Sequence, residues 1–284
     1  MSGALGIIAG GGGVPLRLAA GAARAGRPVF VLALEGFADP ADYAGHPHEV
    51  VRIGAAGRIL ERLRAHGCRQ VVLSGAVKRP SFLALRPDAG AVGLIARIGR
   101  AAMGGDDTLL SAVVRILGEE GFEVVASQDV LKDLLSVPGP VGALVPDAPA
   151  TADIRRGIEV QRALAAADVG QAVVVQQGLV LGLEGVEGTD ALLERVGPLR
   201  REGPGGVLVK LLKPGQSRIV DLPTVGVTTV RGAAAAGLRG IAIEAGGTIL
   251  VDRAAVAAAA DAAGLFVVAI EPDRFPAQEP AAGA

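Results

Sequence analysis

The chain has few of the residue types on which nucleic-acid-binding proteins and zinc proteins depend. Aromatic residues make up 2% of its 284 residues, and the formal net charge is −1. Proteins that bind nucleic acids need a basic surface and aromatic rings on which bases stack, so we exclude this class. One cysteine, Cys68, and three histidines exclude an internal disulfide and a Cys/His zinc site. The composition therefore fits a reducing compartment, the cytoplasm.

Long apolar runs are absent as well. A membrane-spanning helix needs about 18 or more apolar residues, and charged or amide side chains interrupt every candidate run, including 166–186. Residues 1–14 contain a short apolar stretch that is followed by a glycine run and has no basic residue before it. This pattern predicts a first β-strand and not a signal peptide. Any membrane contact is expected to be peripheral.

Half of the residues are apolar and a fifth are charged, which is typical of a folded chain, and the length favours two domains. In the first half, strands predicted at 5–9, 29–34 and 71–74 alternate with helices at 16–25 and 56–65. A helix at 108–120 then leads into a strand at 122–126. Such alternation favours parallel strands with crossover helices, a Rossmann-like arrangement.

Segment 136–151 contains four prolines and two glycines and is predicted to separate the domains, because proline neither continues a helix nor fits a central strand. The predicted organisation is an N-terminal α/β domain at 1–135, a Pro/Gly-rich linker at 136–151, a C-terminal α/β domain at 152–275 and a disordered tail at 276–284.

The second half is predicted to contain a mixed sheet. Apolar runs at 172–176 and 179–183 flank Gln177-Gly178, as in a tight hairpin. A second hairpin-like pair is predicted at 241–244 and 248–251. The other expected elements are helices at 153–167, 189–201 and 228–236, a strand at 206–210, and a helix–strand pair that ends near residue 270.

The glycine run 10–13 lies between the first strand and a helix, where glycine amides can approach a phosphate. It departs from the dinucleotide fingerprint, because Leu16 or Pro15 occupies the place of the third glycine. Glu35 nevertheless ends the second strand where a ribose-binding acid would lie. An NAD(P)-dependent enzyme and a tight turn without ligand therefore remain alternatives to a phosphate site.

Common catalytic motifs are absent: there is no Walker A sequence, no H-E-x-x-H and no G-x-S-x-G. His66 and Cys68 are close in sequence, but a buried thiol is the usual outcome for such a pair. Three of the four lysines, Lys78, Lys210 and Lys213, occur in polar loops, where a lysine can act as a point charge beside phosphate.

Several acidic residues have both a structural and a functional interpretation. Asp221 precedes Leu222-Pro223 and either caps a turn or holds Mg²⁺. Asp106, with Asp107 and Thr108, is expected to cap the start of the helix at 108–120, and Thr189, between Glu187 and Asp190, is expected to be the N-cap of a later helix. Each could instead contact a ligand.

Seven segments, in order from residue 6 to residue 253, closely resemble the LpxI-type UDP-2,3-diacylglucosamine diphosphatases. They are GIIAGGGGVP, ALEGFADP, LSGAVKRPSF, GDDTLLSAVVRILGEEGF, DVGQAVVVQQGLVLGLEGVEGTDALLERV, GGVLVKLLKPGQSRIVDLPTVG and GIAIEAGGTILVDR. The resemblance implies a step of lipid A biosynthesis in Gram-negative bacteria, in which UDP-2,3-diacylglucosamine and water give 2,3-diacylglucosamine 1-phosphate (lipid X) and UMP. It also implies a dependence on Mg²⁺, with Mn²⁺ as the alternative, and two α/β domains that hold the substrate between them. The acylated substrate implies transient contact with the cytoplasmic face of the inner membrane.

The resemblance implies that Asp221, in the VDLPT segment, is essential, and we expect it to be the catalytic and metal-binding carboxylate. Lys210 and Lys213 are expected to offset charge in the transition state. The expected substrate-binding residues are Gly11, Gly12, Gly13, Gly75, Lys78, Asp106, Gln128 and Thr189. A non-catalytic binding module for nucleotide sugars remains an alternative, and a homo-oligomer is expected only because such assemblies are common.

Overall fold

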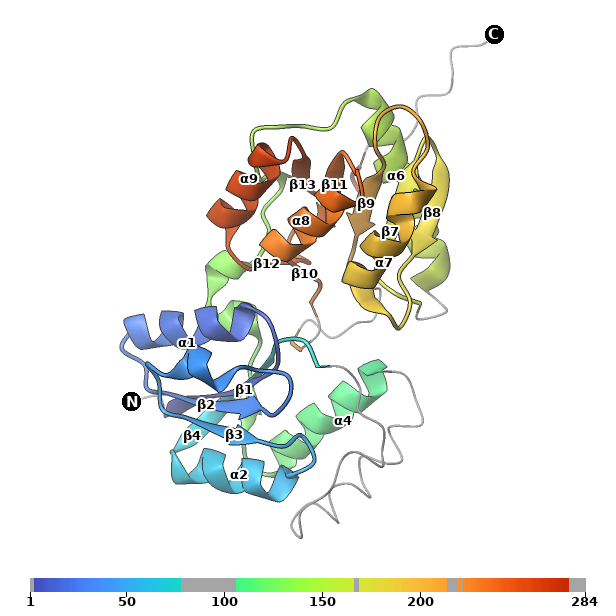
Figure 1. Ribbon diagram of the computed structural model, residues 1–284. Coiled ribbons are helices and arrows are strands. Elements are labelled where there is room, and N and C mark those ends of the chain that lie inside the picture. Colours follow the sequence, from blue (N-terminus) through green and yellow to red (C-terminus); the bar gives the residue numbers. More distant parts are fainter. Residues whose placement is uncertain (1–2, 78–105, 166–168, 214–218, 221, 276–284) are drawn as a thin grey trace. The chain divides into compact units, whose positions relative to one another are not determined.

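The computed structural model (Figure 1) describes residues 3–77, 106–165, 169–213, 219–220 and 222–275, without the side chains of 106–109 and 165. The chain divides into two compact units, which meet in the sequence between Lys132 and Asp133; the first also includes residues 219–220.

The first unit contains a five-stranded sheet in which every pairing is parallel, in the order β3-β2-β1-β4-β5. Its strands are β1 (Ala4–Ala9), β2 (Val29–Leu34), β3 (His48–Val51), β4 (Cys68–Ser74) and β5 (Glu123–Val124). Its helices are α1 (Val14–Arg24), α2 (Ala56–Ala65), α4 (Asp106–Glu119) and α5 (Ser127–Val130), with the 3-10 turn η1 (Pro40–Tyr43). A second 3-10 turn, η3 (Lys132–Leu134), spans the point in the sequence where the two units meet. This strand order is that of a Rossmann-like sheet, as predicted.

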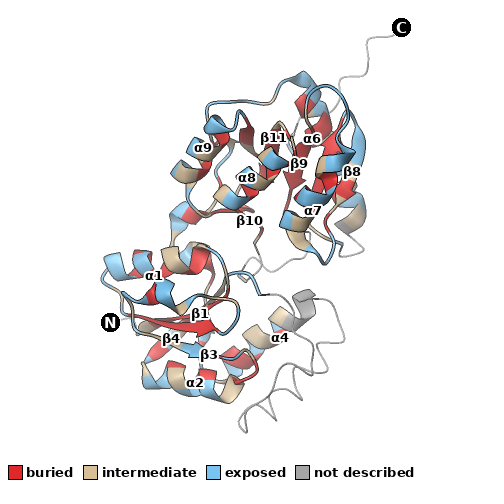
Figure 2. Ribbon diagram, viewed as in Figure 1, coloured by how far each residue is buried: buried red, intermediate tan, exposed pale blue. Residues whose placement is uncertain are grey.

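The core of the first unit forms because β2 is apolar along its whole length and is buried at every residue. Figure 2 shows the central strand β1 mostly as buried ribbon, whereas helices α1 and α2 carry both buried and exposed residues. Cys68 is packed in this core, and burial raises the pKa of its thiol to about 11. The His66 ring stacks on Phe30, with centroids 3.5 Å apart. The prediction of a buried thiol at Cys68 is confirmed.

The second unit contains a six-stranded mixed sheet in the order β6-β13-β11-β9-β7-β8. Its strands are β6 (Gly139–Pro140), β7 (Ala172–Gln176), β8 (Leu179–Leu183), β9 (Val207–Lys210), β11 (Gly240–Glu244) and β13 (Phe266–Ile270). β9, β11 and β13 run parallel, whereas β6, β7 and β8 pair antiparallel with their neighbours. The α/β class, with a parallel sheet first and a mixed sheet second, is confirmed.

Helices cover both faces of this second sheet, because successive side chains of a strand point to opposite faces. Val207 and Val209 of β9 join the core under α6 (Ala148–Ala165). Leu208 joins the core under α7 (Gly188–Val196), α8 (Val227–Ala235) and α9 (Arg253–Ala262). Lys210 follows the same alternation as Leu208 and therefore lies on the α7 side.

The hairpin predicted around Gln177-Gly178 is confirmed. β7 and β8 are antiparallel, and both turn residues have positive φ, 54° and 77°. A two-residue turn with positive φ at both positions has a twist that matches the twist of the two strands it joins. Glycine adopts positive φ without strain.

The second predicted hairpin, at 241–244 and 248–251, is wrong. β11 is already paired on both edges, with β9 and β13. The chain after it continues to β12 (Ile249–Leu250), which pairs in parallel with β10 (Thr224–Val225) in a separate two-stranded sheet.

The segment interpreted as a linker, 136–151, is built into the second unit. Its Gly139–Pro140 pair forms edge strand β6, and Pro149 lies in the first turn of α6, so that helix begins at Ala148 instead of near residue 153. An edge strand and a first helical turn are the positions where the missing proline N–H costs least.

Candidate active site

A buried lysine marks the carboxyl end of the parallel strand β9. Lys210 is the last residue of this strand and is 6% exposed. Its Nζ donates a hydrogen bond to Oγ1 of Thr189 at 2.8 Å and to the carbonyl oxygen of Thr224 at 3.3 Å. Carboxyl ends of parallel strands are the usual location of ligand sites in open α/β sheets.

Thr189 connects this lysine to a buried carboxylate. The Thr189 hydroxyl donates to Oε1 of Glu184 at 2.6 Å, and Oε2 of Glu184 accepts from the Gln171 N–H at 2.9 Å. Glu184 directly follows β8 and is 6% exposed. We call Lys210, Thr189, Glu184 and Thr224 the Lys210 network.

The role predicted for Thr189 as a helix cap is wrong. Helix α7 begins at Gly188 and its N-cap residue is Glu187, which makes no side-chain cap. Thr189 is already the second helical residue, and its hydroxyl is engaged in the Lys210 network instead.

Burial and charge act on Lys210 in opposite directions. Burial lowers the pKa of its ammonium, because the charged form loses solvation, while the carboxylates of Glu184 and Asp190 raise it. Burial is the larger effect, so the pKa of Lys210 lies below its ordinary value. An ammonium has three donors, and the described residues accept from two of them. In the described part of the chain, the third donor of Lys210 has no acceptor.

The other polar residues predicted nearby are arranged differently. Glu187 forms an ion pair with Arg195 at 2.8 Å, and hydrogen bonds from its own backbone and from Arg195 lower the pKa of its carboxyl. Lys213 lies three residues beyond β9 and is half-buried. Asp221 lies outside the described residues, so its role as catalytic residue and metal ligand stays a prediction.

In the first unit, the glycine run lies at the switch point of the sheet, between β1 and β4, where Rossmann-like folds bind ligands. Gly11 and Ala76 exchange two backbone hydrogen bonds of 2.9 and 2.8 Å. A Cβ atom at Gly75 would lie 2.7 Å from backbone atoms of Gly10 and Gly11. The Gly11 amide therefore has a backbone partner, which differs from its predicted role as a donor to ligand.

Gly12 and Gly13 are the open part of this loop. Gly12 is exposed with a φ of 93°, and Gly13 is the N-cap residue of α1 without a side-chain cap. In the described part of the chain, no backbone carbonyl accepts a hydrogen bond from their amides. Gln128, in α5, is half-buried. Lys78 and the Asp106 side chain lie outside the described residues, so their predicted substrate contacts are untested.

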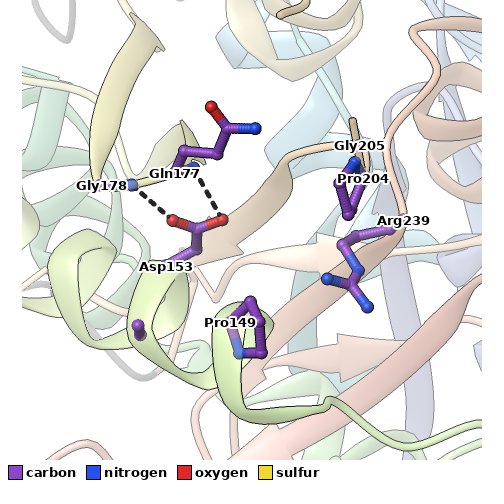
Figure 3. Close-up of a pocket in the computed structure, with 8 residues that line it drawn as sticks. Pro149, Asp153, Gln177, Gly178, Pro204, Gly205 and Arg239 are labelled. Atoms are coloured by element: carbon purple, nitrogen blue, oxygen red, sulfur yellow. Dashed lines mark hydrogen bonds between the residues drawn. The ribbon is translucent and has the colours of Figure 1, made fainter. Parts of the chain in front are cut away.

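A pocket of about 400 Å³ lies at the opposite end of the second sheet (Figure 3). Gly205 and Arg239, which line it, precede β9 and β11, so it opens at the amino ends of these strands. Its buried carboxylate, Asp153, accepts from the N–H groups of Gln177 and Gly178 at 3.1 and 2.7 Å. Asp153 therefore stabilises the β7–β8 turn.

The described part of the chain contains neither a cluster of metal-binding side chains nor a membrane-spanning helix. Its His, Cys, Asp and Glu side chains form no group of three or more that could hold a metal ion. None of its helices has both the length and the apolar character needed to cross a membrane.

Comparison with known proteins identifies the family. The model of the LpxI N-terminal domain matches residues 4–134, and that of the LpxI C-terminal domain matches residues 138–268. The chain belongs to the LpxI family. It is 44% identical to the UDP-2,3-diacylglucosamine pyrophosphatase LpxI of Caulobacter vibrioides over 278 residues, which cover 96% of this chain and 99% of that protein.

Within this LpxI chain, Glu184 was not among the functional residues predicted from the sequence. A carboxylate that directly follows the apolar strand 179–183 was the available signal, because such a residue is buried only when it has partners. Those partners come from the chain before β7 and from α7, and the sequence pattern does not reveal them.

Proposed function

We propose that this chain hydrolyses the pyrophosphate bond of UDP-2,3-diacylglucosamine in lipid A biosynthesis, giving 2,3-diacylglucosamine 1-phosphate and UMP. The name of the Caulobacter relative supports the substrate. The observation that carries the chemistry is the buried Lys210 ammonium at the carboxyl end of β9, where the described residues accept from two of its three donors. The third is proposed to bind a substrate phosphate oxygen.

The reaction transfers one phosphoryl group to water. The water oxygen attacks the phosphorus on the sugar side, the bond from that phosphorus to the bridging oxygen breaks, and the electron pair leaves on UMP. Negative charge develops on the phosphate oxygens during this step. A fixed ammonium in a site with little water stabilises such charge strongly, so we assign this role to Lys210. Lys213, three residues further along the chain, is proposed to share it.

Asp221 is proposed to orient the attacking water. Thr224, whose carbonyl accepts from Lys210, lies three residues after Asp221, so the lysine is tied to the same segment. Mg²⁺, or Mn²⁺ in its place, would act as a Lewis acid on the phosphate oxygens.

We propose that Asp221 would supply a carboxylate ligand to such an ion. Both carboxylate oxygens of Glu184 already accept hydrogen bonds within the protein, so we assign the ion to Asp221 instead. Mg²⁺ at phosphate sites takes one or two carboxylates together with substrate phosphate oxygens. Asp221 with the pyrophosphate would meet this requirement. The acyl chains further suggest transient contact with the inner membrane on its cytoplasmic face.

Phosphorus NMR of the protein with UDP-2,3-diacylglucosamine in ¹⁸O-enriched water tests the proposal, first with Mg²⁺ and then with EDTA. We expect metal-dependent UMP formation with the label on 2,3-diacylglucosamine 1-phosphate. Label on UMP would overturn the site of attack but keep the substrate. Absence of cleavage in both conditions would favour a binding module for nucleotide sugars, and binding of added NAD(P)H would favour an oxidoreductase.

A further inference from the structure

The Glu184 carboxylate is held rigidly. Its backbone N–H donates to the Ala172 carbonyl at 2.8 Å, which continues the β7–β8 pairing. Gly170 lies so close to Glu184 that a Cβ atom added at Gly170 would collide with the Glu184 carbonyl oxygen. The Gln171 N–H then fixes one carboxylate oxygen. The second oxygen is thereby placed against the Thr189 hydroxyl.

The protons in this arrangement can be assigned. An ionised carboxylate only accepts hydrogen bonds, so the hydroxyl proton of Thr189 points to Glu184. The lone pairs of that hydroxyl are left for the N–H of Lys210. A second N–H of Lys210 is used by the Thr224 carbonyl, and no other described residue accepts from the third.

Glu184 also balances charge. A buried ammonium without a nearby anion is costly, and the usual response is loss of the proton. Two charged residues of the described chain act on Lys210, and both are carboxylates: Glu184 after β8 and Asp190 on α7. Glu184 is buried and Asp190 is exposed, so water screens Glu184 less.

We propose that Glu184 is a positioning residue for the pyrophosphate cleavage. It directs the Thr189 hydroxyl and, through it, holds Lys210 as an ammonium with one N–H for the substrate phosphate. This inference rests on the proposed function. Glu184 itself makes no contact with the reacting atoms.

The first test is Glu184→Gln, which keeps the shape of the side chain and removes its charge. We expect kcat to fall by about 30-fold or more while KM changes by less than about threefold, as for loss of an interaction made in the transition state. The basic limb of the kcat profile should move to lower pH, because Lys210 without this carboxylate loses its proton more readily. The control Glu194→Gln removes an exposed carboxylate further along α7, and native kcat is expected. Native kcat and an unmoved basic limb in Glu184→Gln would overturn the proposal.

The second test asks whether Glu184 acts through Thr189. Thr189→Val removes the hydroxyl at nearly constant shape and should also lower kcat by about 30-fold, and Thr189→Ser should restore most of it. In the double variant Glu184→Gln/Thr189→Val, we expect kcat within about threefold of the worse single variant. If the two single losses in kcat multiply in the double variant, the Glu184 carboxylate acts independently of Thr189 and the proposal is wrong. If Glu184→Gln fails to fold, native kcat in Thr189→Val overturns the proposal by itself.

Cleavage of the substrate and the link between Glu184 and Thr189 can be tested separately. If the native protein does not cleave the substrate, the proposed function fails. The link between Glu184 and Thr189 is then judged from urea unfolding of the native protein, the two single variants and the double variant. Non-additive changes in the unfolding equilibrium constant would support it, and additive changes would overturn it.

Discussion

The Nζ atom of Lys210 lies 2.8 Å from Oγ1 of Thr189, although the two residues are 21 positions apart in the sequence. Thr189 begins a helical stripe that continues through Leu192, Leu193 and Val196, which are buried against the second sheet. Lys210 shares the strand face of Leu208, which packs in that same core. The apolar packing of helix on sheet therefore brings a hydroxyl to the ammonium.

If Asp221 orients the attacking water, Asp221→Asn should lower kcat by about 10³-fold or more at saturating Mg²⁺, because the amide is a poorer metal ligand and no base. The rate would be followed by phosphorus NMR. Asp273→Asn, at a side chain that is 95% exposed, is the control and should keep native kcat. Full turnover by Asp221→Asn would show that this assignment is wrong.

The close approach of the loops after β1 and β4 makes Gly75 sensitive to substitution. Its φ is 96°, and an added Cβ would lie 2.7 Å from backbone atoms of Gly10 and Gly11. We expect Gly75→Ala to lower the free energy of unfolding in urea by about 2 kcal/mol or more. At Gly45 an added Cβ meets nothing within 4 Å, so Gly45→Ala should change it by less than about 0.5 kcal/mol. Equal effects at the two positions would contradict the packing explanation.

Much of the fold could be predicted because local patterns are strong in this chain. The strand at 29–34 and the helix at 56–65 have the predicted bounds, since an unbroken apolar run and a helical apolar period each define their limits. The β7–β8 hairpin was predictable from Gln177-Gly178, because this turn requires positive φ.

Features that depend on distant partners were not predictable. β10 and β12 are two residues each, too short for any periodicity, and they are paired across 25 positions of sequence. The edges of β11 are both occupied by strands far away in the sequence, so the local hairpin pattern was misleading. Glu184 is buried for the same kind of reason, since the groups that satisfy it, at Gln171 and Thr189, are brought together only by the fold.

The buried carboxylate at the other end of the sheet should matter for stability and not for turnover. Asp153→Ala leaves the N–H groups of Gln177 and Gly178 without their acceptor, which should lower the free energy of unfolding by about 2 kcal/mol. Because Lys210 lies at the opposite end of β9, kcat should stay within about twofold of native. Glu159→Ala, an exposed residue of the same helix, should change stability by less than about 0.5 kcal/mol. Loss of turnover by a stable Asp153→Ala protein would contradict this separation.

The lowered pKa of Lys210 predicts how its contribution to stability changes with pH. In the unfolded chain the pKa of a lysine is about 10.4. Between the lowered folded pKa and this value the unfolded chain binds one more proton than the folded chain, so the free energy of unfolding rises with pH.

Urea unfolding of the native protein and of Lys210→Met between about pH 7 and 10 checks this prediction, because methionine fills similar space without a charge. The free energy of unfolding of the native protein minus that of the variant should increase with pH, by at most about 1.4 kcal/mol per pH unit. A native-minus-variant difference that decreases with pH would mean that Glu184 and Asp190 outweigh burial and that the folded pKa of Lys210 is raised.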